Sequence, residues 1–360
     1  MKSTNSRSTE GDTDWPQPEE GPVLLPRVAF LGLGWIGRKR LEALGQSGLA
    51  EIMALAEPAP EAIEAAAELA PGAVVARELD ELLALEPDGL VLATPSALPA
   101  GQAIAALEHG CAVFCQKPLA RTAAETEQVL QAARDAGRLL GIDFSYRHTA
   151  GMQAIYRRIR DGHLGQIYAV ELVFHNAYGP DKAWFYNSAL SGGGCLIDLG
   201  THLVDLALWC LDFPAVEGAT GRLLANGRLR RRTAHSGGDA PSQVEDYAAA
   251  QIYLQSGAVV HLTCSWKAPA GCDAWIEAKF FGTKGGAGFH NVNGSFYDFI
   301  AYQFSLDRKR ELLAAPPDDW GGRALVEWAG RLASSPGFDP AVEHVRDVAV
   351  VLDTLYQANQ

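Results

Sequence analysis

Residues 28–37, VAFLGLGWIG, decide the fold that we predict for this chain of 360 residues. The apolar run from Val28 to Leu31 predicts a buried strand, and the glycine-rich turn that follows opens a helix over residues 36–44. This order of strand, turn and helix is the fingerprint of a dinucleotide-binding βαβ unit, although a strand–helix turn without a ligand is the alternative. Such glycines permit a tight turn, close approach of a pyrophosphate, and close helix–strand packing. We therefore expect a dinucleotide to contact Gly32, Gly34, Trp35, Ile36 and Gly37.

The chain around this turn alternates short apolar runs with helical segments up to about residue 143. Further strands are expected at 52–56, 90–93, 112–115 and 139–143, and helices at 61–69, 100–108 and 122–136. Apolar strands separated by helices are typical of a parallel sheet that is covered on both faces. The predicted fold class is therefore α/β, with a doubly wound Rossmann domain over residues 23–144. Residues 1–22 are polar and predict a disordered tail.

The pattern changes after Ser145, and we assign residues 145–360 to a second, α+β domain for substrate binding and oligomerisation. Strands are expected at 167–174, 218–224, 247–254, 258–266, 274–281 and 287–290, and helices at 152–160, 196–209, 322–333 and 341–356. Turn signals between the strands predict an open-faced, mostly antiparallel sheet. Its uncovered face predicts a homodimer or homotetramer, with the C-terminal helix free to pack back on the Rossmann domain. Residues 235–243 predict a mobile loop.

The charge balance limits the classes of partner. Lys and Arg total 30 against 43 Asp and Glu, which gives a net charge of −13 and argues against nucleic acid and anionic membranes. No apolar segment approaches the ~20 residues that span a bilayer. The six cysteines form no Cys-x-x-Cys pair and no zinc-ligand spacing, so no metal site is expected. Reduced thiols fit a cytoplasmic enzyme that acts on a small molecule.

Glu57 predicts the choice of cofactor. It lies 20 residues after Gly37, at the end of the second strand, where a carboxylate accepts the ribose hydroxyls and repels a 2′-phosphate. Pro58 and Ala59 follow, so no arginine is adjacent to hold that phosphate. NAD is therefore favoured over NADP, with a solvated acidic residue as the alternative interpretation of Glu57.

Later residues at the carboxyl edge of the same sheet are expected to contact the cofactor, because ligands bind at this edge in doubly wound folds. They are Thr94, Pro95, Ser96, Gln116 and Lys117. The Lys117 ammonium is also placed to bind the reacting oxygen and to stabilise developing negative charge. A Lys-Pro sequence after a strand can equally be a surface turn.

Asp198 and His202 are four residues apart on a predicted helix, hence on one face of it. The imidazole can take a hydroxyl proton as hydride leaves, with the aspartate as its partner; an ordinary intrahelical pair is the alternative. The aromatic loop over residues 175–186 offers groups that stack on sugars, although it could also pack on its own rings. The residues expected to bind substrate are Lys117, Arg147, Tyr178, Trp184, Asp198 and His202.

Thr94-Pro95-Ser96, Gln116-Lys117-Pro118, and Gly192-Gly193-Gly194 followed by Asp198 and His202 resemble the glucose–fructose oxidoreductase, inositol dehydrogenase and rhizopine-catabolism (Gfo/Idh/MocA) family. The similarity extends from about Val28 to the C-terminus. It implies a Rossmann domain, an open-faced second domain, and a catalytic set that maps onto Lys117, Asp198 and His202. The chain departs from the family at Gln116, where glutamate is usual, and at Leu98-Pro99, where a histidine is common. The amide at position 116 leaves Lys117 without a carboxylate neighbour in the sequence.

These features predict an NAD-dependent oxidoreductase that moves hydride between nicotinamide and a secondary alcohol or ketone of a sugar, cyclitol or related polyol. His202 is the expected general acid/base, Asp198 its partner, and Lys117 the group that polarises the oxygen. Two alternatives remain open at this point. One is a redox-neutral enzyme with tightly bound NAD, which cleaves or epimerises its substrate. The other is a non-catalytic NAD(P)-sensing regulator on the same fold.

Overall fold

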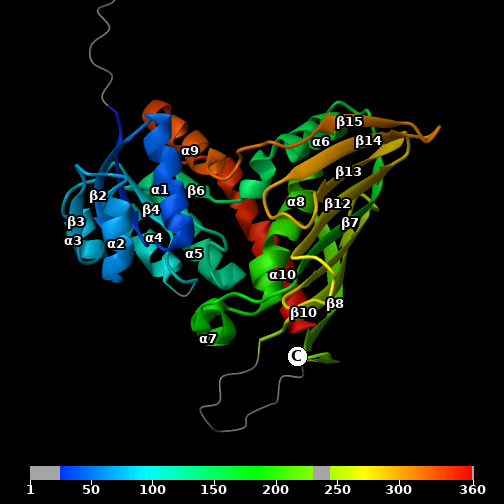
Figure 1. The fold of residues 1–360 in the computed structure, drawn as a ribbon, viewed down its shortest axis with the longest axis horizontal. Coiled ribbons are helices and arrows are strands. Elements are labelled where there is room, and N and C mark those ends of the chain that lie inside the picture. The colour runs from blue at the N-terminus through cyan, green and yellow to red at the C-terminus, as the bar shows by residue number, and fades with distance from the viewer. Residues whose placement is uncertain (1–24, 97, 230–243, 359–360) are drawn as a thin grey trace, which may run out of the picture.

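The computed structural model describes residues 25–96, 98–229 and 244–358. The predicted tail over 1–22 and the predicted mobile loop over 235–243 lie outside the described residues. The described chain forms two bodies, each built on one sheet, with helices α8 and α10 between them (Figure 1).

The first body is a six-stranded parallel sheet in the order β3-β2-β1-β4-β5-β6, which confirms the predicted Rossmann topology. Its strands are β1 (Arg27–Leu31), β2 (Glu51–Ala56), β3 (Val74–Ala76), β4 (Gly89–Leu92), β5 (Ala112–Cys115) and β6 (Leu140–Ile142). Its helices are α1 (Trp35–Ser47), α2 (Pro60–Ala67), α3 (Leu79–Leu83), α4 (Pro99–Glu108) and α5 (Ala123–Ala136). Strand β1 pairs with both β2 and β4, so the strand order reverses beside the glycine-rich turn.

The second body is a nine-stranded sheet in the order β15-β14-β13-β12-β7-β11-β10-β8-β9. Among the described strand pairs of this second sheet, only β7–β11 is parallel. The prediction of a mostly antiparallel sheet is therefore confirmed. The strands are β7 (Ile167–Asn176), β8 (Val216–Ala225), β9 (Arg228–Leu229), β10 (Tyr247–Leu254), β11 (Val259–Ser265), β12 (Ala274–Gly282), β13 (Gly285–Asn291), β14 (Phe299–Ser305) and β15 (Arg310–Ala314).

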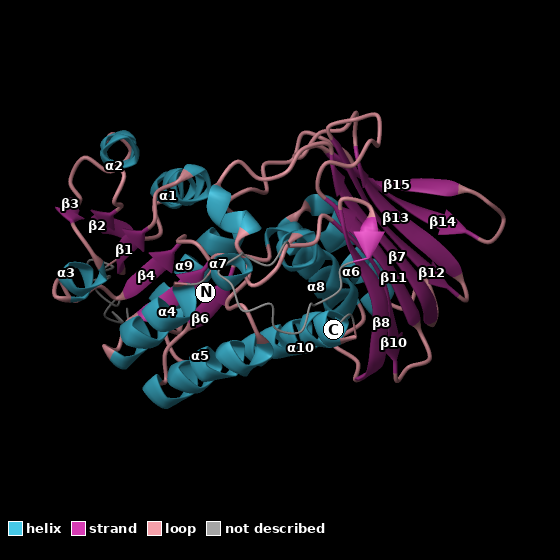
Figure 2. Ribbon diagram, turned by 90° about the horizontal axis from the view of Figure 1, so that it is seen from below, coloured by secondary structure: helices cyan, strands magenta, loops and turns pink. Residues whose placement is uncertain are grey.

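Helices cover one face of this large sheet, and the other face carries none (Figure 2). The covering helices include α6 (Ala150–Arg160), α8 (Thr201–Cys210) and α10 (Val345–Gln357). Strand β10 shows the alternation that follows, because Ala248, Ile252 and Leu254 are buried while Tyr247 and Tyr253 are exposed. Short segments complete this body: η1 (Ser145–His148), η2 (Ala183–Tyr186), α7 (Ser188–Ser191), η3 (Leu196–Gly200) and η4 (Pro340–His344).

Helix α9 (Arg323–Ser334) packs on the first body although it lies near the end of the chain. In Figure 1 it lies beside α1. Its Trp328 ring fits against Gly89 and Gly141, where an added Cβ would lie 2.6 Å from a ring atom in each case. The same ring lies 5.7 Å from that of Phe114. The core of the Rossmann body therefore depends on a residue more than 180 positions further along the chain than its last strand. Among the described residues no helix is long and apolar enough to cross a lipid bilayer.

Candidate active site

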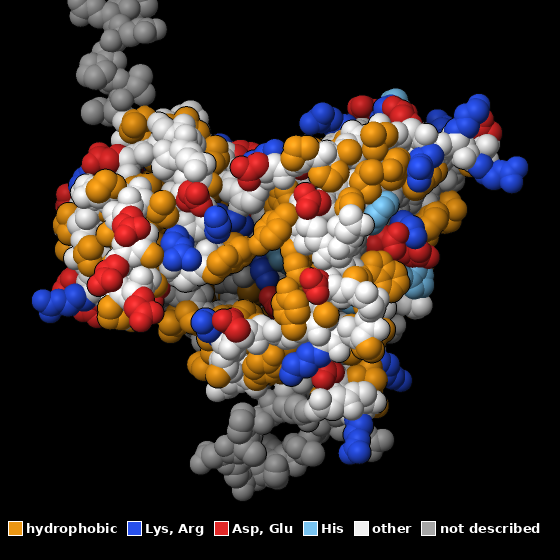
Figure 3. Space-filling view, viewed as in Figure 1, with side chains coloured by type: hydrophobic (Ala, Val, Ile, Leu, Met, Phe, Trp, Pro, Cys, Tyr) orange, Lys and Arg blue, Asp and Glu red, His pale blue; other side chains and the backbone are white. Residues whose placement is uncertain are grey.

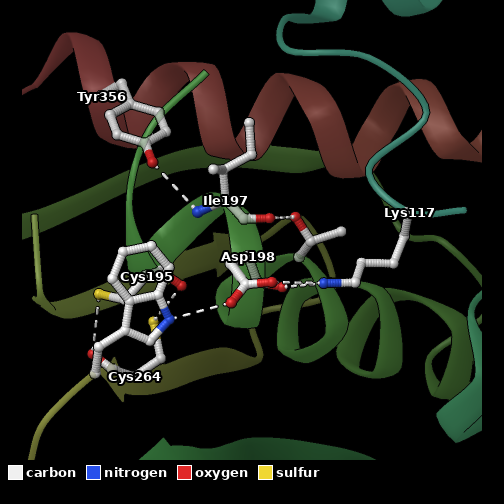
Figure 4. A network of polar contacts seen from close by, with 8 residues as sticks. Lys117, Cys195, Ile197, Asp198, Cys264 and Tyr356 are labelled. Carbon is white, nitrogen blue, oxygen red and sulfur yellow. Dashed lines mark hydrogen bonds and ion pairs between the residues drawn. The ribbon is translucent and has the colours of Figure 1, made fainter. Parts of the chain in front are cut away.

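Lys117 and Asp198 form an ion pair where the two bodies meet. Lys117 follows β5, and its Nζ donates to Asp198 Oδ1 and to the Asp198 carbonyl oxygen, each at 2.8 Å (Figure 4). Both side chains are 17% exposed, so the pair faces a cleft rather than bulk solvent. A hollow with hydrophobic side chains along its walls lies between the two bodies in the space-filling view (Figure 3). The alternative of a free surface turn at Lys117 does not hold.

Asp198 is held from its other side by an indole. Trp266 Nε1 donates to Asp198 Oδ2 at 3.1 Å, so each carboxylate oxygen has its own donor. No hydrogen bond joins Asp198 to His202 among the described residues, so the expected partnership of the two stays a prediction. Residues Leu196–Gly200, which carry Asp198, form a π-helical turn (η3) that leads directly into α8.

His202 lies on α8 in a dry, aromatic environment. It is 8% exposed, and its ring contacts those of Tyr146, with centroids 4.9 Å apart, and Phe174, at 6.3 Å. Its Nδ1 finds no hydrogen-bond partner among the described residues. Burial, and then the charges of Lys117 and Arg40, lower the pKa of His202 well below its usual value. These causes favour the neutral imidazole, which is the form that a general base requires.

The glycines before Asp198 are required because other parts of the chain lie too close to their backbone for a side chain to fit. A Cβ on Gly193 would lie 2.0 Å from the Tyr356 hydroxyl, and one on Gly194 would lie 1.9 Å from the Glu245 carbonyl oxygen. The fully buried Glu245 Oε1 accepts from the backbone N–H of Gly194 at 2.8 Å and of Leu196 at 3.1 Å, and from Tyr356 at 2.7 Å. Tyr356 in turn accepts from Ile197 N (Figure 4). This network fixes the start of the segment that carries Asp198.

The dinucleotide turn has the shape of an anion cradle. Gly32 has φ +92°, and a Cβ there would meet the Ala93 carbonyl carbon at 2.6 Å; one on Gly37 would meet the Gly32 oxygen at 2.1 Å. A Cβ on Gly34 would instead point into open space, where it would occupy room that a ligand could use. No side chain caps the N-terminus of α1 in the part of the chain that the structure describes, and Trp35 there is 56% exposed. These residues fit a pyrophosphate at the positive end of the helix.

Glu57 lies beside this cradle at the end of β2. Its Oε2 accepts from Leu33 N at 2.7 Å and its Oε1 accepts from Ala59 N at 3.1 Å. The carboxylate is thus held against the turn, at the end of β2, where the predicted binding mode has an acidic side chain accept from the ribose hydroxyls.

Gln116 faces a different group from the one that its place in the sequence suggests. Its Nε2 donates to Asp143 Oδ2 at 2.5 Å, and the same oxygen accepts from Arg40 Nε at 2.5 Å. Asp143 and Arg40 are 1% and 4% exposed. The Gln116 amide therefore meets a carboxylate that follows β6, while the carboxylate that pairs with Lys117 is that of Asp198. At the neighbouring strand end Thr94 Oγ1 donates to Gln102 Oε1 at 2.6 Å, and Ser96 is buried.

Arg147, which was predicted to bind substrate, has a structural partner in this structure, and its contact with substrate stays a prediction. Its guanidinium forms a two-contact ion pair with Asp205, one contact being 2.8 Å, and lies over the rings of Phe144, Trp209 and Phe213. Asp205 is 1% exposed and would be left as an unpaired buried charge without it. Arg147 and Asp205 therefore hold η1 against α8.

The aromatic loop packs partly on itself, as the alternative interpretation held. Trp184 stacks on Phe185 with centroids 3.8 Å apart, and Tyr186 donates to the Pro180 carbonyl at 3.0 Å. Tyr178 is 54% exposed and contacts the Phe296 ring. The loop still reaches the site, because its Phe185 and Tyr186 rings contact Trp266.

Sequence reasoning missed several residues of the site: Arg40, Asp143, Tyr146, Glu245, Trp266 and Tyr356. Each acts through a contact with a residue far away in the chain, so no local pattern marked it. The exception is Trp266, which ends a predicted strand and whose size and N–H group could have singled it out. No group of three or more His, Cys, Asp or Glu that could hold a metal is present among the described residues.

Fold and site together define a two-domain oxidoreductase class with a dinucleotide-binding domain and a lysine–aspartate pair at its carboxyl edge. The profile described as an oxidoreductase family with an NAD-binding Rossmann fold matches residues 26–144, and that of the GFO/IDH/MocA C-terminal domain matches residues 152–287. The chain belongs to the Gfo/Idh/MocA family.

Relatives in this family carry names of sugar and cyclitol dehydrogenases. The chain is 31% identical over 209 residues to D-glucoside 3-dehydrogenase of Escherichia coli, covering 57% of this chain and 60% of the relative. It is 28% identical over 212 residues to levoglucosan dehydrogenase of Pseudarthrobacter phenanthrenivorans, covering 55% and 54%. It is 27% identical over 281 residues to the NADP-dependent scyllo-inositol 2-dehydrogenase of Bacillus subtilis, covering 76% and 69%. The matched segments thus span less than two thirds of the length of the first two relatives.

The fold is also that of a solved relative. The structure of levoglucosan dehydrogenase with NADH and levoglucosan aligns with a TM-score of 0.77 at 21% identity, covering 93% of this chain and 97% of that one.

Proposed function

We propose that this protein is an NAD-dependent oxidoreductase that transfers hydride between nicotinamide and a secondary alcohol or ketone of a sugar, cyclitol or related polyol. The observation that carries the proposal is the Lys117 ammonium, held by Asp198 at the carboxyl edge of the Rossmann sheet. The buried, neutral His202 adds a group that can take a proton in the same site.

The proposed cofactor residues are those of the cradle and the sheet edge. Backbone N–H groups of the turn from Gly32 to Gly37, including Trp35 and Ile36, would hold the pyrophosphate, and Glu57 the adenosine ribose. Residues at the ends of β4 and β5 would contact the nicotinamide half of the cofactor. They are Thr94, Pro95, Ser96, Gln116 and Lys117. Bound NAD supplies a hydride acceptor.

The protein's own groups would handle the oxygen and its proton. Lys117 donates to the substrate oxygen and stabilises the negative charge that develops on it. His202 accepts the hydroxyl proton, which leaves the oxygen as a carbonyl forms. Asp198 keeps the ammonium in place through the 2.8 Å contact. Tyr178 and Trp184 remain the proposed sugar-contacting side chains of the loop.

A substrate panel tests this function. The names of the relatives suggest glucosides, anhydro sugars and inositols as the first compounds, each incubated with NAD and followed by the near-ultraviolet absorbance of NADH. We expect NADH to accumulate with at least one of them. Conversion of substrate without any NADH would instead indicate the redox-neutral alternative, and no conversion at all the regulatory one.

We propose NAD rather than NADP because the Glu57 carboxylate, at the end of β2, would accept from the ribose hydroxyls and repel a 2′-phosphate. In the variant Glu57→Ser with Pro58→Arg, the repulsive charge is gone and a cation can meet the 2′-phosphate. We expect the ratio of kcat/KM for NADP to that for NAD to rise roughly tenfold or more, which corresponds to about 1.4 kcal/mol. Glu61→Ser, in the first turn of α2, removes an acidic charge close in the sequence and should leave the ratio unchanged. A parent enzyme that already prefers NADP would contradict this assignment.

We also propose that the protein is a homodimer or homotetramer that associates through the open face of the large sheet. On this face His175 stacks on Tyr247 and contacts the tilted ring of Trp275, and these two aromatic residues are 37% and 45% exposed. Exposed aromatic patches of this kind mark interfaces. Light scattering should give at least twice the chain mass of 38.5 kDa, and Trp275→Asp should shift the population toward monomer. A parent protein that is monomeric at all concentrations would refute this. The cytoplasmic location and the lack of nucleic-acid or membrane partners stay predictions.

A further inference from the structure

Trp266 is a buried residue in direct contact with the proposed catalytic machinery. It follows β11, is 3% exposed, and its backbone N–H donates to the Asp246 carbonyl at 2.8 Å. Its indole N–H points at Asp198 Oδ2, 3.1 Å away, while Lys117 takes Asp198 Oδ1. The two donors approach different oxygens of one carboxylate, so together they define its orientation.

The ring of Trp266 contacts the aromatic loop. The ring of Phe185 meets it edge-on, with centroids 6.2 Å apart, and that of Tyr186 does so at 5.6 Å. Lys267, the next residue, lies over the Tyr186 ring at 5.2 Å. Trp266 therefore stands between the loop and the carboxylate and touches both.

The carboxylate has few other restraints. Lys117 and Trp266 are the side-chain donors to this carboxylate among the described residues, and a hydrogen bond to an ionised group is stronger than one between neutral groups. Without the indole, Lys117 would be the sole side-chain donor to Asp198. The carboxylate could then rotate and carry the flexible lysine ammonium with it. A rigid indole, fixed by its backbone bond and by two rings, prevents that rotation.

We propose that Trp266 is a positioning residue, which fixes Asp198 so that the Lys117 ammonium is held where the substrate oxygen binds. The proposal rests on the proposed function for the role of Lys117. It adds that the loop side chains Phe185 and Tyr186 act on the chemistry through the indole rather than only by touching the sugar.

The variant Trp266→Phe removes the N–H donor but keeps an aromatic ring for the loop. We expect kcat to fall roughly 10–100-fold, the scale of one hydrogen bond to a charged group. KM should stay within about twofold, because interactions specific to the transition state affect kcat rather than binding. Trp328→Phe is the matched control. Trp328 is equally buried at 4%, but its Nε1 has no partner among the described residues, so kcat should not change.

A mutant cycle separates positioning from general damage. If Trp266 acts through Asp198, the double variant Trp266→Phe with Asp198→Ala should be no slower than Asp198→Ala alone. Multiplicative losses would show that Trp266 acts by another route and would overturn the proposal. An unchanged kcat in Trp266→Phe would overturn it as well.

A readout without turnover completes the test. In protein labelled with ¹⁵N at its eight tryptophans, the Trp266 indole signal is identified by its loss in Trp266→Phe. It should move in Asp198→Ala, while the Trp328 signal stays in place. An unmoved Trp266 signal would overturn the proposal even if Trp266→Phe failed to fold. The Trp266 signal could also move in Asp198→Ala although the parent protein turns over no substrate of the panel. That result would refute the proposed function, and with it the positioning role, while the contact between Trp266 and Asp198 would stand.

Discussion

Replacing Lys117 by methionine should lower kcat roughly 10²–10⁴-fold, the range seen when one group that stabilises or moves charge at the reacting atoms is removed. Methionine keeps most of the length of the side chain but has no charge, so the substrate oxygen loses its donor and Asp198 loses its ion pair. Steady-state rates with the best substrate of the panel measure the effect. An unchanged kcat would rule out the role assigned to Lys117.

The same variant should shift the pH dependence. Burial is the largest cause of the low pKa of His202, and the Lys117 charge is the next. Removal of that cation makes protonation of the imidazole less costly, so the pKa of His202 rises toward its usual value. If neutral His202 is the base, the acid limb of the residual rate should move to higher pH. Lys309→Met, on an 84% exposed side chain far from the site, should alter neither kcat nor the profile.

Replacing His202 by glutamine should also lower kcat roughly 10²–10⁴-fold, because glutamine fills a similar space but cannot take the hydroxyl proton. NAD affinity, measured by the quenching of tryptophan fluorescence, should be nearly unchanged, since the predicted cofactor contacts lie on the first body. The acid limb of the pH–rate profile should disappear with the imidazole.

His163→Gln serves as the control for the loss of a histidine. This exposed side chain contacts Arg158, away from the site, so kcat should be retained. A His202→Gln enzyme with full turnover would show that another group, such as Lys117, is the base.

Much of the Rossmann body could be predicted because its signals are local. The strands β1, β2, β4 and β5 are continuous apolar runs, and the turn between β1 and α1 has glycines at positions that geometry requires. Strand β3 was missed because it is only three residues long, at the short end of the range for strands. Strand β14 was missed because its apolar residues lie on both faces and do not alternate.

The candidate site could be predicted only as a set of residues, not as a set of contacts. Lys117 and Asp198 are 81 positions apart, and the structure brings them together as an ion pair. Nothing in the spacing of Asp198 and His202 revealed that the Asp198 carboxylate would accept from Lys117 and Trp266. Glu245 was missed for a similar reason, because the helix start that it holds lies some 50 positions earlier in the chain.

Gln116 shows how a local comparison can mislead. Adjacency to Lys117 suggested that an amide there would weaken the support for the lysine charge. The amide instead donates to Asp143, which is also paired with the buried Arg40. A carboxylate at position 116 would face that of Asp143 in a dry site, so glutamine is the residue that suits this arrangement.

Isotope transfer tests the proposed hydride transfer most directly. A substrate from the panel, deuterated at the carbinol carbon that is oxidised, is incubated with NAD, and the reduced cofactor is analysed by mass spectrometry and proton NMR. Direct hydride transfer predicts that the reduced nicotinamide carries the substrate deuterium at C4, while the substrate is recovered as the ketone. Oxidation of the substrate with no deuterium in the cofactor would contradict it.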